Sequence, residues 1–229
     1  MQPSEARREL YLELLSGASG VTLALFMWGH MVLVGSILTG ERGFDWLAGL
    51  LEDYFIAQPT VVIIFLMFLL HAALASRKIP SQLTERRRMR KLGQELPHAE
   101  SLLWIWQVRT GMLILVLGSF HLILLGIDVL TPLFGERAGI EAASSVARVR
   151  GGLWILYALL LIAVEFHASV GLYRVAIKWG AGLALSRPVL RGIERVLLWF
   201  FLGLGVLVLL VLARVIAPPL GFLLTELPP

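Results

Sequence analysis

The chain has 229 residues, of which 58% are hydrophobic and only 16% are charged. A soluble domain carries about a quarter of charged residues, so this composition excludes a water-soluble globular protein and indicates an integral membrane protein. The net charge of +4 does not indicate a nucleic-acid partner, because the basic residues cluster beside hydrophobic segments, as membrane topology requires.

The first seventeen residues are polar and partly acidic, which argues against a cleaved signal peptide. They predict a short amphipathic helix that lies on the membrane surface before the first span. Five continuous apolar stretches follow, each long enough to cross a bilayer at about 20 residues per crossing. We expect spans at 19–39, 58–76, 102–130, 152–176 and 195–216, within a single domain 1–229. The predicted fold class is an all-α integral membrane bundle of five transmembrane helices.

The distribution of Lys and Arg among the loops predicts the orientation, because basic loops stay in the cytoplasm. One side of the membrane receives most of them: Arg7, Arg8, Arg77, Lys78, Arg86, Arg87, Arg88, Arg90, Lys91, Arg174, Lys178, Arg187, Arg191 and Arg195. The N-terminus is therefore expected in the cytoplasm and the C-terminus outside. The polar segment 77–101 would face the cytoplasm, either as topogenic charge in contact with anionic lipid or as a docking surface for a soluble partner. His98, in this segment, is interpreted as an ordinary loop histidine.

The other four histidines lie inside hydrophobic segments, one in each of the first four: His30, His71, His121 and His167. An ionisable side chain at membrane depth is costly unless a partner takes its polar atoms, so each is a candidate functional residue. His30 and His121 each lie about nine residues before the outer end of their helix, roughly 13 Å below that surface. His71 and His167 lie roughly 9–13 Å from the cytoplasmic side. The four histidines therefore form two layers, each supplied by two helices.

Two imidazoles on opposite sides of an iron are what a six-coordinate haem needs, and such a haem transfers electrons because no coordination position is open. The chain has no cysteine, which excludes covalent haem attachment and iron–sulfur ligation and leaves non-covalent b-type haem. Histidines bonded across helices are the alternative reading of the pattern. Copper or zinc is disfavoured because two imidazoles per layer leave these ions short of ligands.

Small residues near the histidines agree with bound porphyrin rings, which need room beside their ligands. They are Gly29, Gly118, Gly171 and Ala75. The alternative explanation for each of these small residues is close packing between helices, which is as common a reason for small residues in membrane helices as room for a cofactor.

The order of four histidines on the first four of five spans resembles the dihaem cytochrome b subunit of quinol:fumarate reductases and succinate dehydrogenases. The stretch Leu25-Phe26-Met27-Trp28-Gly29-His30-Met31 looks like the first-helix motif of that family, and Glu165-Phe166-His167 is similar to its fourth-span ligand region. The resemblance implies a distal haem held by His30 and His121 and a proximal haem held by His71 and His167. It also implies a flavoprotein subunit and an iron–sulfur subunit docked on the cytoplasmic face.

Further site residues follow in part from this resemblance. Glu165 is an acid deep in a span, and a glutamate at this spacing in the family is implicated in proton transfer; a structural hydrogen bond is the alternative. Lys178 and Trp104 match family positions near haem propionates. Arg109 would be costly in lipid unless a propionate or carboxylate pairs with it, with snorkelling or interfacial anchoring as the alternative for all three. Glu52 is preferred over its neighbour Asp53 as the carboxylate of a quinol site, although either acid fits a solvated loop.

These observations predict a membrane-anchor cytochrome b of the bacterial cytoplasmic membrane, the quinol-oxidising subunit of a quinol:fumarate reductase. Electrons would pass from menaquinol through two haems b to the iron–sulfur subunit and on to fumarate. The alternatives are the succinate:quinone reductase direction or a cytochrome b subunit of another membrane oxidoreductase. A haem-free anchor or a proton-coupled transporter would be a different class of protein. Whether the complex is dimeric is left open.

Overall fold

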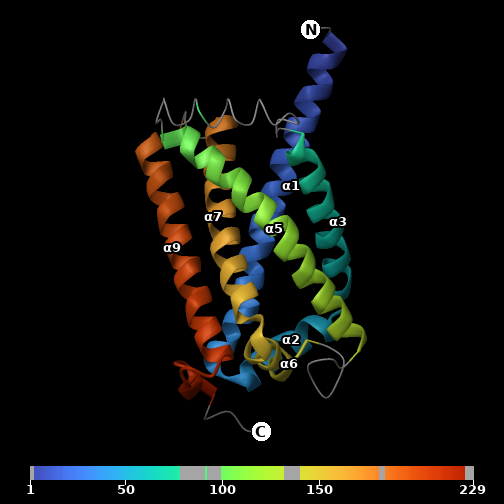
Figure 1. The fold of residues 1–229 in the computed structure, drawn as a ribbon, viewed down its shortest axis with the longest axis vertical. Coiled ribbons are helices and arrows are strands. Elements are labelled where there is room, and N and C mark those ends of the chain that lie inside the picture. The colour runs from blue at the N-terminus through green and yellow to red at the C-terminus, as the bar shows by residue number, and fades with distance from the viewer. Residues whose placement is uncertain (1–2, 78–90, 92–98, 132–139, 181–183, 225–229) are drawn as a thin grey trace.

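Five long helices form one bundle in the computed structural model, which describes residues 3–77, 91, 99–131, 140–180 and 184–224 (Figure 1). The helices are α1 (Pro3–Gly35), α3 (Ala57–Ser76), α5 (Ala99–Leu130), α7 (Trp154–Lys178) and α9 (Arg187–Leu212). All five are long and apolar enough to span a membrane, which confirms the predicted all-α class and the number of spans. His98 and most of the segment 77–101 lie outside the described residues.

The amphipathic surface helix predicted for the N-terminus is wrong as a separate element. Residues Pro3–Gly35 form a single helix that continues into the first span. The small residues between the two parts contain no proline, so nothing interrupts the backbone hydrogen bonds. Two ion pairs tie the polar first turns to the bundle: Glu9 with Arg77 at 2.7 Å, and Glu13 with Lys178.

The last span also differs from the expectation of 195–216, because α9 begins eight residues earlier and ends at Leu212. A proline in its first turn favours the early start, since the fixed φ of proline suits the first helical position. At the other end the chain turns sharply, and Arg214 adopts a positive φ of 57°. The first turns of α9 are polar and form the end of the bundle where the N-terminus also lies (Figure 1).

The loops alternate between the two ends of the bundle as the spans predict. The end of α3 and the starts of α5 and α9 lie with the N-terminal half of α1, whereas α2 (Glu41–Asp53) and α6 (Ala142–Arg148) lie at the opposite end (Figure 1). We call these the N-terminal end and the opposite end. The side of the membrane that each end faces stays a prediction from the basic loops.

The opposite end is closed by a small apolar core that sequence analysis did not predict. One face of α2 is buried through Phe44 and Ala48, which pack with Ile37, Ala142 and Val208. Asp45 on α2 accepts a hydrogen bond from the backbone N–H of Ala142 at 2.7 Å, so it caps the first turn of α6. A π-helical turn (Val149–Leu153), in which Gly152 has a φ of 106°, then connects α6 to α7.

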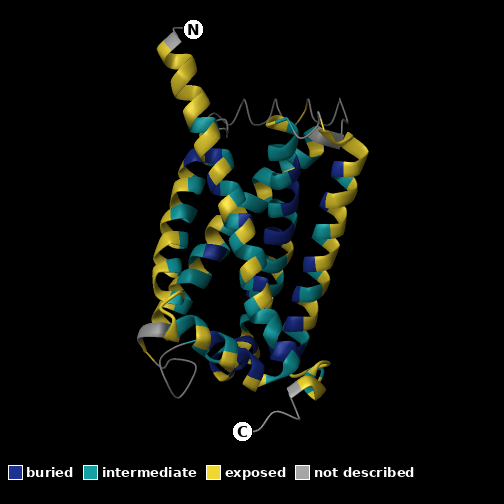
Figure 2. Ribbon diagram, turned by 180° about the vertical axis from the view of Figure 1, so that it is seen from behind, coloured by how far each residue is buried: buried dark blue, intermediate teal, exposed yellow. Residues whose placement is uncertain are grey.

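The outer surface of the bundle is apolar, and buried residues lie on the inward faces of the helices (Figure 2). In water such a surface would be far larger than the apolar patches of soluble proteins, whereas in a bilayer lipid chains cover it. The polar backbone is bonded within each helix, as hydrocarbon requires. Burial therefore marks the contacts between helices, and the exposed apolar side chains mark the face toward lipid.

Close packing of α7 against α9 depends on Gly205, because an added Cβ would lie 2.3 Å from Leu161 Cδ1. We therefore expect Gly205→Ala to separate the two helices and to destabilise the bundle by about 1–3 kcal/mol. The measurement is the thermal unfolding midpoint of the detergent-solubilised protein, followed by far-ultraviolet circular dichroism.

Gly203→Ala is the matched control on the same helix, since no atom lies within 4 Å of its added Cβ. This variant should be neutral or slightly more stable, because alanine favours helix more than glycine. Equal midpoints for the two variants would contradict the predicted α7–α9 contact.

Candidate functional site: two histidine pairs in one internal cavity

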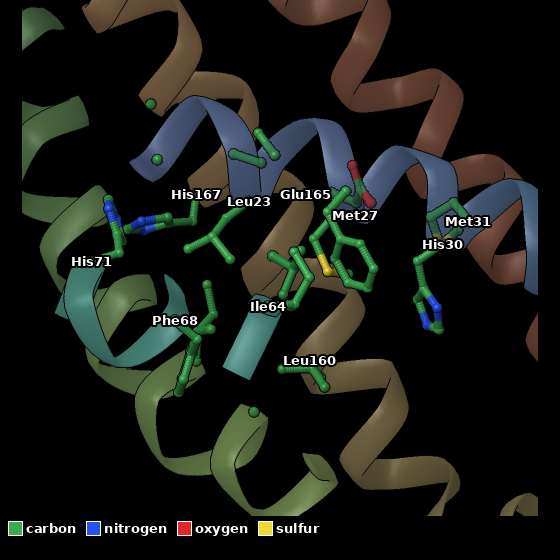
Figure 3. A pocket seen from close by; sticks show the side chains of 18 of the residues that line it. Leu23, Met27, His30, Met31, Ile64, Phe68, His71, Leu160, Glu165 and His167 are labelled. Atoms are coloured by element: carbon green, nitrogen blue, oxygen red, sulfur yellow. The ribbon is translucent and has the colours of Figure 1, made fainter. Parts of the chain in front are cut away.

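A cavity of about 1110 Å³ runs through the bundle and is lined by all four of the histidines that sequence analysis singled out. His71 and His167 lie together at one side of the close-up, and His30 lies at the other side (Figure 3). Between them stand apolar side chains, labelled as Leu23, Met27, Ile64, Phe68 and Leu160 (Figure 3). The cavity therefore offers an apolar interior with imidazoles toward both ends.

The pair nearer the N-terminal end is His71 on α3 and His167 on α7. Their ring centroids are 6.4 Å apart and the ring planes are nearly perpendicular, at 87°. His167 Nδ1 donates a hydrogen bond to the backbone carbonyl of Gln107 at 2.9 Å. A carbonyl can only accept, so Nδ1 carries the proton and the Nε2 lone pair is available to a ligand.

His71 Nδ1 also has a polar partner, the hydroxyl of Ser19 on α1. The Ser19 hydroxyl donates to the carbonyl of Ser16 at 3.1 Å, which leaves its oxygen to accept from His71 Nδ1 at 3.0 Å. Ligating histidines in proteins typically donate their second ring N–H in this way, which fixes ring orientation and the tautomer. His167 is thus prepared to offer its Nε2 atom, and the ring of His71 is held by Ser19.

The second pair is His30 on α1 and His121 on α5, with centroids 6.5 Å apart and planes inclined at 56°. Tyr157 packs edge-on against His121 at 5.5 Å between centroids. The Nδ1 atom of His121 is buried and has no hydrogen-bond partner among the described residues. An unpaired buried polar atom is costly, so this ring favours a partner other than the described side chains.

Two glycines that sequence analysis did not single out allow the rings of the first pair to sit where they do. An added Cβ at Gly111 on α5 would lie 2.8 Å from His167 Cε1, and one at Gly20 on α1 would lie 3.0 Å from His71 Cε1. Gly111 precedes His121 by ten residues, and Gly20 precedes His30 by ten residues. This repeated spacing, about 15 Å along a helix, was the signal in the sequence that could have found them.

The glycines expected to leave room for a cofactor differ in their surroundings. Gly29 lines the cavity and has no atom within 4 Å of an added Cβ, so it does leave open space. An added Cβ at Gly118 would contact Phe68, and one at Gly171 would lie 3.0 Å from Gln107 Nε2. Gly171 therefore makes room for the amide of Gln107. Ala75 lines the cavity as well.

The remaining predicted site residues are distributed unevenly around the cavity. Trp104, Lys178 and Glu165 line it, and Glu165 is only 1% exposed. The ammonium of Lys178 is bonded to Glu13.

Arg109 does not line the cavity. It is on an exposed face of α5, with its guanidinium 5.1 Å from the centre of the Trp106 ring. Glu52 is in the last turn of α2, and its neighbour Leu51 reaches the cavity.

Two further cations line the cavity and were not singled out from the sequence as site residues. Arg148, at the opposite end, is 5% exposed and donates to Ser145 Oγ at 2.9 Å. Arg174 donates to Gln107 Oε1 at 2.7 Å. A guanidinium at the margin of an apolar span was the available signal, but its direction around the helix depends on packing that a single sequence does not reveal.

Within the part of the chain that the structure describes, no three His, Cys, Asp or Glu side chains come together as a metal site. Each histidine pair can therefore supply two ligands and no more. Such a pair suits a metal ion that is already bound within a macrocyclic cofactor and needs two further ligands.

The fold and the cavity define a multi-span membrane protein of the histidine-lined helical-bundle type. Residues 82–212 match the family described as the transmembrane subunit of succinate dehydrogenase and fumarate reductase. The chain is 35% identical over 202 residues to a fumarate reductase cytochrome b subunit of Helicobacter pylori, covering 85% of this chain and 76% of the relative. It is 36% identical over 184 residues to the protein of the same name from Wolinella succinogenes, covering 77% and 69%. The chain belongs to this family of transmembrane subunits.

Proposed function

We propose that the chain is the membrane-anchor cytochrome b subunit of a quinol:fumarate reductase and holds two haems b. The observation that carries the proposal is the pairing of four membrane-depth histidines, two by two, along one internal cavity. Membership of the family supports it, since the two similar relatives are both named fumarate reductase cytochrome b subunits.

The separation of the rings fits two axial ligands of one iron. Imidazole nitrogens that bind a metal from opposite sides, at about 2 Å each, place the ring centres about 6 Å apart. The observed separations are 6.4 Å for His71 with His167 and 6.5 Å for His30 with His121. Rings that were merely bonded to one another across helices would share a hydrogen bond, whereas His71 and His167 direct Nδ1 to Ser19 and Gln107.

The cavity also offers partners for the ionised edge of a porphyrin. When bound, haem b supplies a one-electron carrier, and two of them would pass electrons along the bundle. Carboxylates in a low-dielectric site need cations or hydrogen-bond donors. Lys178, Arg174 and Trp104 can supply these beside the proximal pair, His71 and His167, while Arg148 can do so beside the distal pair, His30 and His121. Arg109 is less suited, because it faces away from the cavity.

The orientation proposed from the basic loops gives the electron path a direction. The N-terminal end, with the proximal pair, would face the cytoplasm, where a flavoprotein subunit and an iron–sulfur subunit dock. Menaquinol would be oxidised near the distal pair, where a carboxylate has to accept a proton. Glu52 is suited to this role because α2 carries it at that end, beside cavity-lining Leu51. In a complex that oxidised succinate, electrons would pass through the same haems in the opposite direction.

Glu165 is suited to carry a proton between the two pairs, where it lies in the close-up (Figure 3). Its Oε2 atom and Ser169 Oγ are buried without a hydrogen-bond partner in the described chain, and the side chain of Trp28 interacts with the Glu165 carboxyl group. Ser169 is one turn beyond Glu165 on α7, so the two share a face. Moving an electron inward across a negative-inside membrane costs about 2.3 kcal/mol per 100 mV, and an accompanying proton would make the transfer electroneutral.

His71→Ala should remove one of the two haems, because the variant would keep only one of the two histidines that hold it. The reduced-minus-oxidised visible spectrum and the pyridine haemochrome content of the purified protein measure this. His98→Ala, in the polar segment 77–101, is the matched control and should keep both haems. Absence of a b-type band from the unaltered protein would favour a haem-free anchor, and retention of both haems in His71→Ala would contradict the dihaem proposal.

Gly111→Ala should lower the occupancy of the proximal haem, since the new methyl would lie 2.8 Å from His167 Cε1 and displace the ring. The distal haem should remain, because His121 is ten residues away along α5 and the other distal ligand, His30, is on α1. Redox titration of the visible band separates the two haems. Gly126→Ala, on the same helix with no atom within 4 Å of the added Cβ, should behave as the unaltered protein. Equal haem loss from both variants would contradict the steric explanation.

Glu165→Gln should slow quinol-driven fumarate reduction by roughly a hundredfold, the usual range for removing a proton-transfer group, without loss of haem. The rate is measured with the intact complex in proteoliposomes, with and without an imposed membrane potential. Glu194→Gln is the control, since Glu194 is another buried glutamate but pairs with Arg191 at 3.2 Å. Haem reduction that is independent of membrane potential, both before and after Glu165→Gln, would argue against the proton role.

A further inference from the structure

Gln107 on α5 contacts α7 at three successive positions of one helix face. Its backbone carbonyl accepts from His167 Nδ1 at 2.9 Å. Its side-chain Nε2 is 3.0 Å from where a Cβ of Gly171 would be. Its side-chain Oε1 accepts from Arg174 Nη1 at 2.7 Å. Residues 167, 171 and 174 are spaced by four and three, so they form one row along the helix.

These contacts hold the backbone carbonyl of Gln107 in one place relative to α7. The amide packs closely against α7 where residue 171 lacks a side chain, and the charged hydrogen bond from Arg174 fixes its far end. The carbonyl that accepts the hydrogen bond from His167 Nδ1 therefore cannot shift along α7 without straining the contact between the Gln107 side chain and Arg174. Gln107 and Arg174 together brace the ligand ring from the neighbouring helix.

The other histidines are held differently. His71 bonds to the hydroxyl of Ser19, which can rotate, and Nδ1 of His121 has no partner among the described residues. The two pairs also differ in ring geometry: the planes are inclined at 87° in the proximal pair and at 56° in the distal pair. The braced ring thus belongs to the pair whose planes are nearly perpendicular.

Arg174 adds a charge to this arrangement as well as a hydrogen bond. It lines the same cavity as His167 and is seven residues further along α7, about 10 Å at 1.5 Å per residue. Reduction of an iron adds a negative charge, and a nearby cation in a low-dielectric site favours that state. Its guanidinium is therefore placed to raise the reduction potential of whatever metal centre His167 ligates.

Building on the dihaem function proposed above, we propose that Gln107, braced by Arg174, is a positioning residue for the proximal haem. It fixes the plane of the His167 ring, and Arg174 raises the reduction potential of the iron. The role is specific to one of the two haems, so the pair contributes to the difference between their spectra and potentials.

The experiment compares Gln107→Leu and Arg174→Gln with the unaltered complex. Perpendicular imidazole planes give low-spin ferric haem its largest g value, so freeing the ring in Gln107→Leu should lower and broaden that value for the proximal haem. In Arg174→Gln the reduced-to-oxidised ratio of this haem at fixed potential should fall up to tenfold, which corresponds to about 59 mV. Low-temperature electron paramagnetic resonance and redox titration measure these changes.

Two variants serve as matched controls. Gln58→Leu makes the same substitution at an exposed position in the first turn of α3, and Arg187→Gln removes an exposed cation at the N-terminal end. Neither should change the proximal g value or potential. Gln107→Glu keeps an acceptor for Arg174 and should restore the g value that Gln107→Leu loses, which a general weakening of the bundle would not explain.

The outcomes separate this inference from the proposed function. If the unaltered complex lacks two b haems, or if His167→Ala keeps both, the proposed function fails. If both haems are present and Gln107→Leu and Arg174→Gln change neither the proximal g value nor its potential, the positioning role is wrong. If Gln107→Leu loses the proximal haem and Gln107→Glu retains it, the bracing by Arg174 is supported.

Discussion

A polar side chain inside a bilayer finds no water, so it requires a partner within the protein, and the architecture of this bundle follows from that constraint. Four imidazoles lie at membrane depth. Two of them direct their Nδ1 protons to acceptors on neighbouring helices, namely Ser19 on α1 and Gln107 on α5. These bonds connect α1 to α3 and α5 to α7, and they leave the Nε2 atoms to another partner. The same contacts that satisfy the polar groups thus hold the helices around the cavity and prepare it for a ligand.

The polar groups at the two ends of the cavity differ in their hydrogen-bond partners. At the N-terminal end Lys178 pairs with Glu13 and Arg174 pairs with Gln107, whereas the buried Ser169 Oγ has no partner among the described residues. Toward the opposite end, His121 Nδ1 and Glu165 Oε2 are buried with no hydrogen-bond partner in the described chain, and Trp28 interacts with the Glu165 carboxyl group. A transferred proton would give the Glu165 carboxyl group a partner, so this buried acid supports the proton proposal.

Glycine has two separate roles in the bundle. Gly205 lets α9 approach Leu161 on α7, and small residues commonly allow such close contacts between membrane helices. Gly20 and Gly111 instead face the rings of His71 and His167 from adjacent helices. Because glycine at either kind of position looks identical in a sequence, the glycines chosen from proximity to a histidine along the chain were not those that contact the rings. Gly171, four residues after His167, proved to accommodate Gln107.

The sequence alone determined the class, the number of spans and the pairing of histidines by depth, because hydropathy and helical rise are properties of consecutive residues. It also predicted the polar residues Trp104, Lys178 and Glu165, which line the cavity. Only the tertiary structure decided which side chains face inward: Arg174 and Arg148 do, whereas Arg109 lies against Trp106 on an exposed face. It also revealed that α1 is one helix and that α2 and α6 close the opposite end. The rotation of a helix about its axis depends on contacts with its neighbours, and these contacts join residues far apart in the chain.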